Sequence, residues 1–246
     1  MMRTLMMLCK TEILRIFRSP FYVIWSLMMP ILFYVIFTRI VNTGSDNPGE
    51  WQAHYLMSMT AFSVMGSSIM TMGIWLVQER TQGWSTYMRM TPLPEVIYFG
   101  GKVFGQMMMN VFSIICIFLA GYLINGVSLA PLTWIYSGLW ILVGSLPFLA
   151  LGTLVGNMKR AETASGISNA LYLSLAVMGG MWMPMDILPR LMQAIGRWLP
   201  SYPFGSGAWA IIRGQAPEWS NVLILLGYLF LFMILSTYIR KKQEAV

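Results

Sequence analysis

Residues 103–125 read VFGQMMMNVFSIICIFLAGYLIN, an apolar stretch without a charged side chain. The absence of Asp, Glu, Lys, Arg and His continues as far as Met158. A helix needs about 20 mostly apolar residues to cross the hydrocarbon core of a bilayer. The run is therefore long enough for two membrane-spanning helices with a short connection between them.

The composition of the whole chain agrees with this interpretation. Of the 246 residues, 57% are hydrophobic and 10% are charged, whereas a soluble domain carries roughly 25% charged residues. We predict an all-α integral membrane protein in which residues 1–246 form a single transmembrane domain. The first apolar run is too long for a signal-peptide core, so no cleavable signal peptide is expected. Six spans are predicted, at residues 21–41, 54–77, 103–125, 133–156, 164–183 and 220–239.

The basic residues predict the orientation, because cytoplasmic ends of spans are enriched in Lys and Arg. Twelve of the 16 Lys and Arg residues lie before the first span, after the second and fourth, or after the last. They are Arg3, Lys10, Arg15, Arg18, Arg80, Arg89, Lys102, Lys159, Arg160, Arg240, Lys241 and Lys242. We therefore expect both termini in the cytoplasm. Because the net charge of +7 is spread over short clusters between spans, no nucleic-acid partner is expected.

Two segments outside the spans also carry apolar stripes. In residues 3–18, Leu5, Cys9 and Ile13 share one helical face with other apolar residues, which predicts an amphipathic helix in the plane of the inner leaflet. A cytoplasmic extension of the first span is the alternative. Residues 183–204 are apolar, too short to span and broken by prolines. They predict an outer re-entrant or interfacial helical hairpin before the last span.

The loop QERTQGWSTYMRMTPLP, residues 78–94, has a pattern of its own. Trp84, Tyr87 and Thr91 follow helical spacing, and Pro92 and Pro94 stop a helix there. Exposed aromatic side chains of this kind favour a protein contact. An aromatic belt at the level of the lipid headgroups explains them equally well.

Several kinds of chemistry are missing from the sequence. Gly100-Gly101-Lys102-Val103 lacks the spacing and the Ser or Thr of a P-loop, so the chain is not expected to hydrolyse ATP alone. No Cys/His cluster has metal-ligand spacing, and neither a metal nor a cofactor is expected in this chain. An intramembrane serine protease would need a base for Ser168, and the single histidine, His54, is badly placed for that role. Ser168 is better explained as a small packing residue.

Three polar side chains fall inside predicted spans. Gln106 and Asn110 are four residues apart and share a helix face, and Asn169 lies in the fifth span. They are either interhelical hydrogen-bonding groups or a polar strip along a transport path. Gly152 and Gly156 form a GxxxG pair, which favours close helix packing.

Taken together, three features resemble the permease subunits of type-2 ATP-binding-cassette exporters, over nearly the whole chain. They are the in-plane helix ending at Phe17-Arg18-Ser19-Pro20, the loop from Glu79-Arg80 to Thr91-Pro92-Leu93-Pro94, and the proline-punctuated segment Pro184, Leu188-Pro189 and Leu199-Pro200.

The resemblance implies two permease chains, as a homodimer or with a related permease, and two separate ATPase subunits that bind ATP and Mg. It implies that loop 78–94 is a coupling helix touching the ATPase. The expected contact residues are Glu79, Arg80, Trp84, Tyr87, Arg89, Thr91 and Pro92. The outer segment is expected to dip into the lipid and gate the path. The gate residues are Pro184, Leu188, Pro189, Leu191, Ile195 and Pro200.

The expected function is export, from a bacterial plasma membrane, of a hydrophobic or amphiphilic substrate: a drug, an antimicrobial peptide or a lipid-like molecule. Uncharged spans and 23 methionines favour such cargo. A polysaccharide exporter, or a membrane immunity or signalling protein that transports nothing, is the alternative.

Overall fold

The computed structural model describes residues 11, 20–40, 48–84, 87, 90 and 94–244, and every regular element in these ranges is helical. The predicted all-α class is confirmed. The predicted in-plane helix over residues 3–18 lies outside the described residues, except for Thr11.

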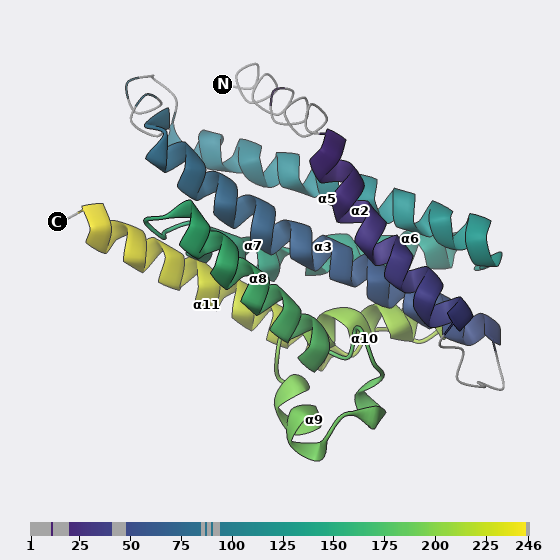
Figure 1. The fold of residues 1–246 in the computed structure, drawn as a ribbon. Coiled ribbons are helices and arrows are strands. Elements are labelled where there is room, and N and C mark those ends of the chain that lie inside the picture. The colour runs from purple at the N-terminus through teal and green to yellow at the C-terminus, as the bar shows by residue number, and fades with distance from the viewer. Residues whose placement is uncertain are drawn as a thin grey trace.

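Figure 1 shows how the helices are arranged. In chain order they are α2 (Pro20–Val35), the π-helical turn η1 (Ile36–Ile40), α3 (Pro48–Thr81), α5 (Glu95–Asn125), α6 (Pro131–Gly144), α7 (Leu146–Val155), α8 (Ala161–Met178), the 3-10 turn η2 (Met185–Ile187), α9 (Arg190–Gly196), α10 (Ser201–Ile212) and α11 (Trp219–Glu244).

Four helical segments of the described chain are long and apolar enough to cross a membrane: Pro48–Thr81, Val96–Asn125, Pro131–Val155 and Trp219–Gln243. They match four of the predicted spans. The predicted spans at 21–41 and 164–183 fall on shorter helices, since the apolar part of the first is Ser26–Ile40 and α8 has 18 residues. A multi-pass membrane protein is therefore established, and the count of six spans stays a prediction.

Helix α3 is the centre of the bundle and packs against α2, α5, α6, α7, α8 and α10. Its closest approach is to α7. A Cβ atom on Gly152 would lie 2.6 Å from the backbone oxygen of Ser68, and a Cβ on Gly73 would lie 3.1 Å from the oxygen of Gly152. Only glycine permits two backbones to come so close. The predicted role of Gly152 in helix packing is confirmed.

Two parts of the chain lie at the margin of this bundle. Helix α11 runs along its edge, and α9 lies outside it beside α8 (Figure 1).

One end of the bundle gathers Arg80, Lys102, Arg160 and Lys241, and we call it the basic end. The C-terminal ends of α3 and α11 and the start of α5 meet there, as their side-chain contacts show.

Candidate functional site

The site is the connection between α3 and α5 at the basic end. Helix α3 stops at Thr81, and Gly83 adopts a φ of 76°, a left-handed conformation suited to the end of a helix. A short turn follows, in which the Tyr87 amide donates to the Gly83 carbonyl at 3.1 Å. Pro94 is the N-cap residue of α5, which begins at Glu95. Of the predicted contact residues, Arg89, Thr91 and Pro92 lie outside the described residues.

Two aromatic side chains project from this turn. Trp84 is 46% exposed and Tyr87 is 60% exposed, and their rings stack with centroids 5.7 Å apart. Met90, also on this connection, is exposed too. The turn thus displays an apolar patch at the basic end. Exposed aromatic side chains of this kind are suited to anchor a protein interface.

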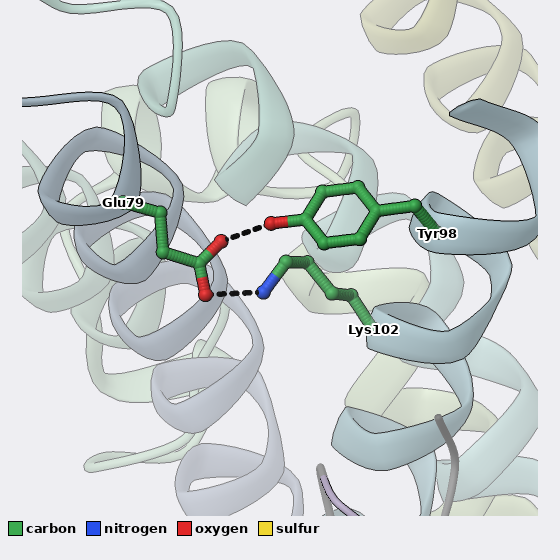
Figure 2. Close-up of polar contacts among 3 residues, drawn as sticks. All are labelled: Glu79, Tyr98 and Lys102. Carbon is green, nitrogen blue, oxygen red and sulfur yellow. Dashed lines mark hydrogen bonds and ion pairs between the residues drawn. The ribbon is translucent and has the colours of Figure 1, made fainter. Parts of the chain in front are cut away.

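Glu79 points the other way, into the protein. Lys102 Nζ lies 2.6 Å from its Oε1, and the Tyr98 hydroxyl donates to its Oε2, as Figure 2 shows. The side chains of Lys102 and Glu79 are 4% and 6% exposed. Lys102 also lies 5.0 Å from the centre of the Tyr98 ring. This buried cluster joins the last turns of α3 to the first turns of α5, so it fixes both ends of the connection.

Arg80, the next residue, binds a different pair of helices. Its guanidinium donates to the carbonyls of Gly156 and Asn157 and to Gln243 Oε1, the last two at 3.3 and 3.4 Å. The carbonyls at the end of α7 otherwise lack helical partners, and a cation there is favourable. Glu79 and Arg80 therefore hold the root of the exposed turn from opposite sides, and direct contact of either side chain with a partner stays a prediction.

Sequence reasoning missed part of this arrangement. Lys102 was interpreted as a topology signal, and Tyr98, Asn157 and Gln243 were not singled out. A usable signal existed: Tyr98 and Lys102 are four residues apart on one face of α5, directly after the connection from Glu79. For Asn157 and Gln243, only the packing of α7 against α11 brings the residues together.

The three polar residues predicted inside the spans lie in different surroundings. Gln106 and Asn110 are buried, and Gln106 Nε2 donates to Asn110 Oδ1 at 3.2 Å. The Asn110 amide also binds Ser67 and Ser68 of α3 and Ser145 between α6 and α7. These contacts are interhelical. Asn169 is exposed on α8 and is absent from this network.

The segment at 183–204, predicted to lie on the outer side, contains η2, α9 and the start of α10. Leu191 and Ile195 of α9 are 80% and 55% exposed, whereas Pro200 is buried. Leu188 and Pro184 are half-buried, and Pro189 precedes α9 and is exposed. Apolar packing continues past the predicted end at 204, since α10 buries Phe204 and Trp209 in the bundle. Burial of α9 in the outer leaflet stays a prediction.

The geometry around His54 favours the packing explanation over a protease. The His54 ring stacks on Trp209 at 4.6 Å. The Ser168 hydroxyl is fully buried and, within the described ranges, makes no hydrogen bond. No nucleophile–base pair is formed by these two residues.

Comparison with known proteins agrees with a transport role. The family model described as ABC-2 family transporter protein matches residues 38–239. The chain is 59% identical over 235 residues to the "Putative transport permease YvfS" of Bacillus subtilis (strain 168), with 96% of each chain covered. It is 28% identical over 129 residues to the "Linearmycin resistance permease protein LnrN" of the same strain, a match that covers 48% of this chain and 33% of that relative.

Proposed function

Because the chain belongs to the ABC-2 family of transporter proteins, we propose that it is the permease of an ATP-driven exporter whose ATP and Mg are bound by two separate ATPase subunits. One observation carries the proposal. The connection between α3 and α5 exposes the stacked Trp84 and Tyr87, while Glu79 and Arg80 fix its root to four helices. A patch that is apolar, exposed and directly follows side chains bound to several helices is suited to receive force from a partner.

The basic end faces the cytoplasm in this proposal, since Lys and Arg collect on that side of a bacterial plasma membrane. Both termini lie there with six spans. The ATPase then docks on Trp84 and Tyr87, and the outer segment with α9 lies at the opposite face. Glu79 and Arg80 act as positioning residues for this docking surface.

A second copy of the chain is proposed to pack on the exposed face of α8. That face carries Gly166, Asn169, Ala170 and Ser174, and a Cβ on Gly166 would meet no atom within 4 Å. Small residues at four-residue spacing and an exposed amide suit a helix–helix interface better than lipid. Asn169 then lies beside the substrate path between the two copies.

The substrate is proposed to be hydrophobic or amphiphilic. The exposed residues of α8 include no Trp, Tyr or Phe on which sugars would stack. The relative LnrN, named for linearmycin resistance, supports an antimicrobial cargo. A strain lacking this chain should therefore become more sensitive to amphiphilic antimicrobials, and unchanged resistance across such a panel would contradict the cargo class.

Affinity capture of the tagged chain tests the ATPase contact. We expect an ATP-binding-cassette ATPase to copurify, and Trp84→Ala to weaken its binding by about 30-fold, because truncating an interface anchor costs about 2 kcal/mol. Trp219→Ala is the matched control, since Trp219 is 81% exposed at the far end of α11. Equal ATPase recovery with both variants would reject the docking surface.

A further inference from the structure

Helix α11 is attached to the bundle in an unusual way. Of its described residues only Asn221 and Leu225 are buried, and its apolar side chains face outward along most of its length. Within a bilayer, apolar packing alone gives little preference for a neighbouring helix over lipid. Helix α11 packs along α7 and against α10, and two sets of polar contacts fix its position on these neighbours.

The first of these contacts lies at the basic end. Asn157, which follows α7, donates through Nδ2 to the Ser236 hydroxyl at 3.0 Å and to the Ser236 carbonyl at 3.2 Å. Gln243 Nε2 donates to the Asn157 carbonyl at 3.1 Å, and Arg80 donates to Gln243. We call these four residues the inner fastening. It ties the C-terminal half of α11 to the root of the α3–α5 connection.

The second contact lies near the start of α11. Asn221 Nδ2 donates to the Ser206 hydroxyl of α10 at 3.1 Å. Leu225, one turn further on, is in the same buried cluster as Phe204 of α10. We call Ser206 and Asn221 the outer fastening. Helix α10 directly follows the segment with α9, so this contact ties α11 to the predicted gate.

We infer that α11 transmits movement of the α3–α5 connection to the outer segment, as a rigid helix bound at both ends. A helix of 26 residues is about 39 Å long and resists compression, so a shift at one fastened end moves the other. The inference rests on the proposed function, because it requires an ATPase to move the connection. It assigns Asn157, Gln243, Ser206 and Asn221 as positioning residues for transport.

The test measures movement at the outer segment and needs no transport substrate. A single cysteine replaces Ile195, which is 55% exposed, in a chain lacking Cys9 and Cys116. The complex with its copurified ATPase is placed in lipid nanodiscs, and the rate of labelling by a charged thiol reagent is compared without nucleotide and with ATP plus vanadate. We expect the two rates to differ by about 5-fold or more, the lower end of ordinary coupling between sites.

Asn157→Ala and Asn221→Ala should each abolish this difference while ATP hydrolysis continues. Removing both fastenings should add little, because the inference requires both polar contacts for transmission along α11. Thr237→Ala is the control, because among the residues that the structure describes the Thr237 hydroxyl donates to the Met233 carbonyl of its own helix, at 2.8 Å, and to no other helix. If Asn157→Ala does not fold, Asn221→Ala and Ser206→Ala test transmission through α11 at the other end of the helix.

Three outcomes would overturn the inference. The first is an equal labelling rate of the Ile195 cysteine with and without nucleotide in the complex that carries no further substitution. The second is a nucleotide-dependent difference in labelling rate that is as large in Asn157→Ala and Asn221→Ala as without them. The third is loss of that difference in Thr237→Ala. Failure of any ATPase to copurify would instead contradict the proposed function itself.

Discussion

Helices α3 and α11 are both long enough to cross a bilayer, yet they are built for opposite surroundings. In the most apolar 18-residue window of each, 78% of α3 is buried against 6% of α11. The more buried helix is the less apolar of the two. Its sequence is rich in Gly, Ser, Thr and Met, whereas α11 is a run of Leu, Ile and Phe with few small residues.

This contrast shows that hydrophobicity and burial are separate properties of a helix in a membrane protein. A helix that faces hydrocarbon must be apolar, but it gains little from a large side chain at a protein contact. A helix enclosed by six others gains from close backbone approach and from interhelical hydrogen bonds. Substitutions should therefore be costly in α3 and its contacts and mild on the outer face of α11.

The largest difference is expected between two glycines. Gly152→Leu should prevent folding, because its Cβ would lie 2.6 Å from the Ser68 carbonyl oxygen, and backbone cannot move aside. Gly227→Leu on α11 should be tolerated, since nothing lies within 4 Å of a Cβ there. Size-exclusion profiles of the solubilised variants measure the effect. A monodisperse Gly152→Leu protein at normal yield would remove the contrast.

A large effect is also expected at the buried ion pair. Glu79→Ala removes the carboxylate from its buried ion pair with Lys102 and should cost about 3 to 5 kcal/mol of stability. Replacing both Glu79 and Lys102 by Met should recover most of the loss, because neither charge of this pair is then buried. Thermal unfolding in detergent measures both variants, with Glu162→Ala on the exposed surface of α8 as control. A double variant no more stable than Glu79→Ala would contradict this account.

The smallest effect separates two asparagines. Asn110→Leu should lower stability by about 1 kcal/mol, since hydrogen bonds between membrane helices are individually weak. Asn169→Leu should leave the unfolding temperature unchanged and reduce export or assembly of two copies. If instead Asn169→Leu destabilises the single chain and Asn110→Leu does not, the assignment of packing and path residues is reversed.

Part of the candidate site could be predicted from the sequence. Trp84 and Tyr87 stand three residues apart between a Gly and two prolines, and that local pattern is enough to predict an exposed helical turn. The inward direction of Glu79 and Arg80 could not be predicted in the same way. Charged residues at the end of a span fit a cytoplasmic surface equally well, and Gln243, a partner of Arg80, is far along the chain.

By itself the sequence determined the membrane class, the helical content and four long spans. The reason is that the length of an apolar run is a local property, and it must match the thickness of the hydrocarbon core. It also determined that Gly152 belongs at a helix contact. Only the tertiary structure decided that α3 is central and α11 peripheral, that Glu79 pairs with Lys102, and that Asn110 and Asn169 have separate surroundings. Each of these depends on which helices become neighbours, and apolar helices of similar length do not encode their neighbours in hydropathy alone.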